Sequence, residues 1–270
     1  MIAVELSKLV RSRRTWVTIA VIDALPIVVA VLLSLTDLGP RPGTAPAFLS
    51  AVLADGSLYP LAAMAMILPL FLPAAVAVTA GDAIAGEAQQ GTLRYVLIRP
   101  VGRTRLLVAK LIAVMAFVLL TLLVVAATAF VLGLLLLGNG DATTSTTFSG
   151  TSLTQGQLVV RTGLALAYAL LSMLGVASVA LFLSTIVRSP LAAAMGTLAL
   201  LIGSSLLLTL DAANALQPYL VTRYWLSFVD LFRDPILWHD VVRGVLLQAG
   251  YVVVFLAAAW ANFVTKDITD

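Results

Sequence analysis

Residues 105–137 read RLLVAKLIAVMAFVLLTLLVVAATAFVLGLLLL, and Arg105 and Lys110 are the only charged side chains in this stretch. A helix of about 20 apolar residues is long enough to cross the hydrocarbon core of a bilayer. This stretch is longer, so its helix can tilt in the membrane or extend beyond it. It therefore predicts a membrane-spanning α-helix.

The composition of the whole chain extends this prediction. Of 270 residues, 61% are hydrophobic and 11% are charged, whereas a soluble domain carries about 25% charged residues. So few charges cannot cover a water-facing surface, and we predict an all-α integral membrane protein that forms a single domain over residues 1–270. The absence of cysteine excludes disulfides and thiolate metal sites. Six membrane-spanning helices are expected at about 16–35, 60–80, 105–137, 159–187, 190–210 and 244–264.

Three segments outside these spans have a composition of their own. Residues 1–15 predict an amphipathic helix lying on the membrane surface, with Glu5 and Lys8 on its polar face. They lack the pattern of a signal peptide, so we expect them to be retained. Residues 138–157 are small and polar and predict a flexible aqueous loop. Residues 211–243 are rich in Tyr, Trp and Phe, which favours short re-entrant or interfacial helices, with a loosely docked surface loop as the alternative.

The distribution of Lys and Arg predicts the orientation. If both termini lie on one side of the membrane, that side holds 11 of the 16 basic residues and the other side holds 5. Positive charge accumulates on the cytoplasmic side. We therefore expect both termini, and the segment 81–105, to be cytoplasmic in a multi-pass protein of the plasma or inner membrane.

The sequence offers little for catalysis. We expect no catalytic residue and no metal site, because the single histidine, His239, stands apart from any ligand cluster. Asp23 lies inside the first span, where an ionisable group is costly. It could hydrogen-bond to a neighbouring helix, line a substrate path or carry a proton. Pro69 and Pro73 predict a kink in the second span, because each proline removes a helical hydrogen bond.

Residues 81–100 read GDAIAGEAQQGTLRYVLIRP and carry the most specific pattern in the chain. Gly81 and Gly86 have the spacing of a phosphate-binding loop, but Glu87 and Ala88 stand where such a loop has Lys and Ser or Thr. A carboxylate repels phosphate and alanine cannot ligate Mg²⁺. This segment is therefore not expected to bind a nucleotide itself.

The same residues carry a family resemblance. Gly86, Glu87, the Gly91-Thr92-Leu93 triplet, Arg99-Pro100, Arg103 and finally Lys110 resemble the cytoplasmic loop of six-helix ABC transporter permeases of the second class. The N-terminal Glu5, Lys8, Arg11, Ser12 and Arg13, and the C-terminal Phe263, Lys266, Asp267 and Ile268, are also similar to that family. Gln89 and Gln90 depart from it, because charged residues are common there in the family.

The resemblance implies a non-catalytic permease of an ATP-driven exporter, in which the loop 81–105 contacts a separate ATPase. Two permease chains, identical or homologous, would assemble with two ATPase subunits that hold ATP and Mg²⁺, and a cargo would leave the cell by efflux. Amphipathic drugs, lipids, glycolipids and peptides all suit so apolar a path. Membrane lipids are expected partners and nucleic acid is not. The resemblance assigns ATPase coupling to Gly86, Glu87, Gly91, Thr92, Leu93, Arg94, Arg99, Pro100 and Arg103.

Other interpretations of the sequence remain. Glu87 could simply pair with a neighbouring Arg at the membrane edge. The whole chain could also be an ion-coupled carrier, a membrane-embedded enzyme, or a membrane anchor that transports nothing. A carrier or an intramembrane enzyme needs ionisable groups inside the membrane, and Asp23 is the one acid that the sequence places there.

Overall fold

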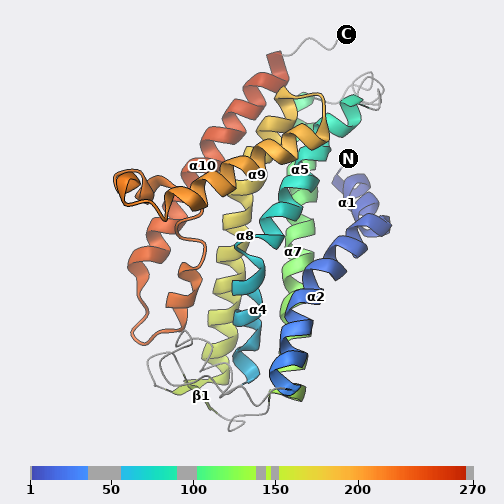
Figure 1. The fold of residues 1–270 in the computed structure, drawn as a ribbon. Coiled ribbons are helices and arrows are strands. Elements are labelled where there is room, and N and C mark those ends of the chain that lie inside the picture. The colour runs from blue at the N-terminus through green and yellow to red at the C-terminus, as the bar shows by residue number, and fades with distance from the viewer. Residues whose placement is uncertain (1, 36–55, 90–101, 138–143, 147–151, 266–270) are drawn as a thin grey trace.

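The computed structural model describes residues 2–35, 56–89, 102–137, 144–146 and 152–265. Within these residues, six helices are long and apolar enough to cross a membrane (Figure 1). The predicted all-α membrane fold with six spans is thereby confirmed. The six are α2 (Arg13–Leu35), α5 (Phe71–Gln89), α7 (Arg103–Leu136), α8 (Gln155–Ile186), α9 (Pro190–Leu207) and α10 (Trp238–Thr265).

The second predicted span is divided in two. A short η1 (Gly56–Leu58) leads into α4 (Tyr59–Ile67), and α5 starts only at Phe71. Pro69 lies in the turn between α4 and α5, and Pro73 lies in the first turn of α5, where the missing N–H would have no helical partner in any case. The helix is therefore interrupted by a turn at residues 68–70, between α4 and α5.

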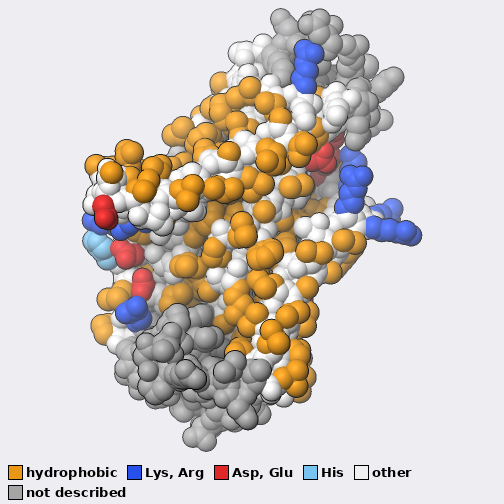
Figure 2. Space-filling model, in the orientation of Figure 1, with side chains coloured by type: hydrophobic (Ala, Val, Ile, Leu, Met, Phe, Trp, Pro, Cys, Tyr) orange, Lys and Arg blue, Asp and Glu red, His pale blue; other side chains and the backbone are white. Residues whose placement is uncertain are grey.

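The helices pack around α8. This helix contacts α5, α7, α9 and α10, while α2 lies against α7. Large apolar side chains such as Phe117 and Leu122 are fully enclosed between them. Many others point outward, including Val21, Leu246 and Val253, and Figure 2 shows this apolar cover over the helices. Such a surface suits lipid contact and would be a liability in water.

The N-terminal helix α1 (Ile2–Arg11) is separated from α2 by Ser12. Leu9 packs against the core, but Val4 and Val10 are exposed. Glu5, which we placed on an outer polar face, is turned toward the protein with its side chain only 14% exposed. The inward face of α1 is therefore mixed, and its polar part contributes to the site described below.

The region predicted as a flexible loop over residues 138–157 contains regular structure that we missed. β1 (Thr144–Thr146) pairs antiparallel with β2 (Ser152–Thr154). The side chain of Thr154 then caps α8 by accepting a hydrogen bond from the Gln157 amide, and the side-chain oxygen of Gln157 accepts one from the Thr154 amide.

Residues 211–243 form three short 3₁₀ helices before α10 begins, namely η2 (Asp211–Ala213), η3 (Gln217–Tyr219) and η4 (Ser227–Phe232). Phe228 is fully buried, and the Tyr168 hydroxyl donates to the Tyr224 carbonyl at 2.6 Å. The alternative of a loosely docked loop is therefore wrong. The segment is a packed part of the fold, held against α8 and α10.

The ends of the elements divide the molecule into two halves. In Figure 1, α1, the end of α5 and the end of α10 lie in the upper half, and the β1–β2 hairpin lies at the bottom. The start of α1 and the end of α10 therefore share one half of the molecule with the end of α5.

Candidate functional site

The two glycines of the phosphate-loop-like pattern lie inside a helix. Residues 81–89 are the last turns of α5, so this part of the segment 81–105, which we expected to form a loop, is helical. A Cβ at Gly81 would lie 3.0 Å from the Ala194 amide nitrogen and 3.3 Å from the Pro190 carbonyl oxygen. A Cβ at Gly86 would overlap the carboxylate of Asp82. Gly81 thus allows α9 to approach closely, and Gly86 leaves room for an acidic side chain.

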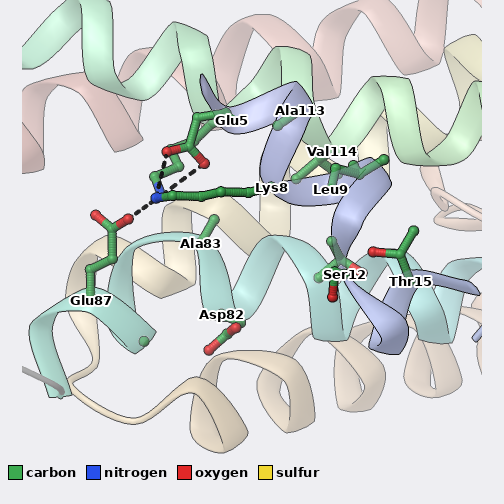
Figure 3. A pocket seen from close by; sticks show the side chains of 13 residues that line it. Glu5, Lys8, Leu9, Ser12, Thr15, Asp82, Ala83, Glu87, Ala113 and Val114 are labelled. Atoms are coloured by element: carbon green, nitrogen blue, oxygen red, sulfur yellow. Dashed lines mark hydrogen bonds and ion pairs between the residues drawn. The ribbon is translucent and has the colours of Figure 1, made fainter. Parts of the chain in front are cut away.

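Glu87 takes part in an ion-pair cluster that joins three helices. Lys110 of α7 pairs with Glu87 of α5, and its Nζ lies 3.2 Å from Glu5 Oε2 of α1. Lys8 lies 3.3 Å from the other oxygen of Glu5. Figure 3 shows Glu5 and Glu87 turned toward each other across this cluster.

Burial makes the central pairs stronger than the peripheral one. The Lys110 side chain is 7% exposed, and those of Glu5 and Glu87 are 14% and 17% exposed, whereas the Lys8 side chain is 62% exposed. Exposed pairs contribute little because solvent screens them. Removing one member of a buried pair, by contrast, leaves a charge without compensation. Lys110 is therefore the residue on which the cluster depends.

A cavity of about 320 Å³ lies beside the cluster, between α1, the start of α2, α5 and α7. It is lined by Glu5, Lys8, Asp82, Glu87 and Lys110 together with hydroxyl and small apolar side chains (Figure 3). Among the described residues, no group of three or more His, Cys, Asp or Glu side chains could hold a metal ion. The arrangement offers electrostatic linkage between helices.

Arg103, the other described coupling candidate besides Gly86 and Glu87, joins two helix ends. Its guanidinium donates to the carbonyls of Phe263, at 3.2 Å, and Val264, at 2.6 Å, in the last turn of α10. Carbonyls at that end of a helix lack intrahelical donors and attract cations. Trp260 adds a second link, since its Nε1 donates to Thr104 Oγ1 at 3.0 Å. The start of α7 is thus fixed to the end of α10.

The remaining coupling candidates, Gly91, Thr92, Leu93, Arg94, Arg99 and Pro100, lie outside the described residues.

Asp23 lies apart from this cluster. It is 5% exposed, and Thr128 Oγ1 of α7 donates a hydrogen bond of 2.7 Å to its Oδ1. Of the three roles considered for Asp23, hydrogen bonding to a neighbouring helix is the one visible in the structure. His239 is exposed in the first turn of α10.

The sequence placed Glu5 and Lys110 only within the family pattern, without a role in a site, and did not single out Ser184. Lys110 gave a usable signal, because it is a lone charge two turns inside an apolar helix. Glu5 gave none, since its contact with Lys110 spans 105 residues. Ser184 of α8 contacts the backbone of α5 across about 100 residues, and nothing in its local sequence predicts this.

Comparison with known families gives one match over most of the chain. The family described as ABC-2 family transporter protein matches residues 1–203, which run from α1 into α9. No curated protein matches the chain. The matched range includes all four members of the ion-pair cluster, so the cluster belongs to the part of the chain that the family shares.

Proposed function

The chain belongs to the ABC-2 transporter family and is a permease subunit of an ABC transporter, and on this premise we propose that it is the membrane-spanning part of an ATP-driven exporter. Two such chains, identical or homologous, form the substrate path. Two separate ATPase subunits bind ATP and Mg²⁺ and contact the segment 81–105. The resemblance noted in the sequence is confirmed at the level of the family, and the assembly is our proposal.

The observation that supports ATPase coupling most is the sharing of Lys110 by Glu5 and Glu87. The segment 81–105 begins on α5 and ends on α7, so a partner that displaces it acts on both helices at once. A buried cation held by carboxylates from α1 and α5 keeps the three helix ends together. A displacement of the segment then moves them as one body rather than separating them.

Two further links connect α7 to other membrane-spanning helices. Arg103 attaches the start of α7 to the end of α10, and the hydrogen bond from Thr128 to Asp23 attaches α7 to α2. Helices α2, α7 and α10 therefore follow the same displacement. A tilt of these helices opens a path between the two permease chains.

The 11-to-5 distribution of basic residues supports a cytoplasmic position for both termini and for the ATPase. The ends of α1, α5 and α10 share one half of the molecule (Figure 1), as this orientation requires. The cargo is apolar or amphipathic, such as a lipid, a glycolipid, a peptide or a drug, because the helices present few charges.

Copurification tests the proposed assembly. The tagged chain, extracted in mild detergent from its native membrane, is expected to bring down an ATPase with the motif G-x-x-x-x-G-K-[ST], identified by mass spectrometry. The isolated chain should not hydrolyse ATP, whereas the complex should. A chain that purifies without any ATPase and transports cargo on an ion gradient alone would instead be a carrier.

A further inference from the structure

Ser184 of α8 makes an unusual contact with the backbone of α5. Its side chain is 1% exposed, and its hydroxyl donates to the Gly81 carbonyl at 2.7 Å. The same oxygen accepts hydrogen bonds from the amides of Ala85, at 2.9 Å, and Ile84, at 3.2 Å. In an α-helix the amide of residue i+4 bonds to the carbonyl of residue i. Gly81 and Ala85 are such a pair, and the hydroxyl engages both partners.

The neighbouring residues make this contact possible. Gly81 and Ala85 lie one turn apart on the same side of α5 and have minimal side chains, so α8 can approach the backbone. On the side of α9, a Cβ at Gly81 would meet the Ala194 amide nitrogen at 3.0 Å. α5 is thus held between two helices at this level.

Three other buried hydroxyls among the described residues behave differently. Ser172, Ser178 and Thr197 each donate to the carbonyl four residues earlier in their own helix, as Ser and Thr commonly do in helices. Ser184 instead bonds to a different helix, where its hydroxyl donates to one carbonyl and accepts from two amides. A side chain inserted into the hydrogen-bond ladder is a recognised origin of helix bending.

The position of the contact along α5 suggests its use. Gly81–Ala85 comes just before the last turn of α5, which carries Glu87. We propose that Ser184 is the positioning residue of a hinge in α5, which rests on the proposed coupling function. Its hydroxyl satisfies the backbone groups of Gly81 and Ala85 as the last turn swings with the ATPase, and it holds α5 against α8 meanwhile.

The test compares Ser184→Ala with the matched control Ser178→Ala, which removes a buried hydroxyl from the same helix that bonds only within it. Because the chain has no cysteine, spin labels can be attached through Gln89→Cys and Arg188→Cys, both at exposed positions. Electron paramagnetic resonance then reports the distance between the end of α5 and the end of α8. In Ser184→Ala the Gly81 and Ala85 groups bond only to each other, so the distance distribution should shift and narrow relative to wild type and to Ser178→Ala.

A second measurement uses the complex with its ATPase in vesicles. Ser184→Ala should hydrolyse ATP yet transport about fivefold less cargo per ATP, while Ser178→Ala should couple normally. A wild-type complex that does not transport would contradict the proposed function, but it would leave the distance measurement intact. Unchanged distances in Ser184→Ala would overturn the hinge, whatever the transport assay gives. Changed distances with full coupling would also overturn it, since the Ser184 contact would then have no role in coupling.

Discussion

Lys110 and Glu87 form an ion pair across 23 residues of sequence, and most of the segment 81–105, which the family resemblance assigns to ATPase contact, lies between them. One partner lies at the end of α5 and the other two turns into α7. The ion pair thus joins the end of α5 to α7, and Glu5 of α1 is the third member of the cluster.

Replacing Lys110 should destabilise the fold more than replacing Lys8. Lys110→Met leaves the carboxylates of Glu5 and Glu87 close together and mostly buried, which should cost about 3 kcal/mol of unfolding free energy. Lys8→Met removes an exposed pair and should cost less than about 1 kcal/mol. Thermal unfolding of the detergent-solubilised chain measures both. Lys110→Met combined with Glu87→Gln should recover part of the loss, and equal effects of the two lysine variants would refute the central position of Lys110.

The Asp23–Thr128 hydrogen bond should be structural. Thr128→Val removes the donor and should cost about 1–2 kcal/mol, because a buried carboxylate loses a partner. Asp23→Asn keeps an acceptor, so it should fold and transport close to normally. Unfolding temperature and vesicle transport measure the two effects. Loss of transport in a well-folded Asp23→Asn variant would contradict a purely structural role and would show that Asp23 lines the substrate path or carries a proton.

Replacing Gly81 and replacing Gly203 with alanine should change the stability of the fold in opposite directions. Gly81→Ala places a Cβ 3.0 Å from backbone in α9 and should destabilise the chain by about 1–3 kcal/mol through overpacking. Gly203→Ala meets no atom within 4 Å and should be neutral or stabilising by up to about 1 kcal/mol, because alanine favours helix. The unfolding temperatures of the isolated chain, measured for both variants and for wild type, test this difference. A tolerant Gly81 would mean that α5 and α9 are not closely packed there.

Cysteine labelling tests the orientation. Ser145→Cys in the β1–β2 hairpin should react with a membrane-impermeant reagent applied to intact cells, and Gln89→Cys at the end of α5 should not. The reason is the 11-to-5 distribution of basic residues, which favours the α5 end on the cytoplasmic side. Permeabilised cells serve as the control, where both should react. The reverse pattern would place the ATPase contact on the wrong side of the membrane.

The parts of the fold that the sequence predicts are those set by length and local chemistry. Apolar runs predict the six spans because a bilayer requires long apolar helices, and Pro69 and Pro73 mark the region where α4 and α5 are separate. The beginning of α10 at Trp238 and the hairpin at Thr144–Thr154 escaped prediction. In the hairpin, polar residues form regular structure through strand pairing, and Thr154 then caps α8, so apolar periodicity does not reveal it.

The candidate site was predicted only in part, because most of its contacts join residues that are distant in the sequence. Glu87 follows from its motif, which is local. Its linkage to Glu5 through Lys110, and the contact of Ser184 with Gly81, depend on which helices become neighbours. No local pattern encodes contacts between residues about 100 positions apart.

The most direct test of ATPase coupling is transport per ATP hydrolysed by Glu87 variants, measured on the complex reconstituted with its ATPase. A charge-assisted hydrogen bond contributes about 1.5–3 kcal/mol, and Glu5 retains Lys110 when Glu87 is lost. Both Glu87→Gln and Glu87→Ala should therefore insert and assemble. We predict continued ATP hydrolysis with reduced transport, and a larger reduction in Glu87→Ala. Normal transport per ATP in Glu87→Ala would contradict coupling through this ion pair.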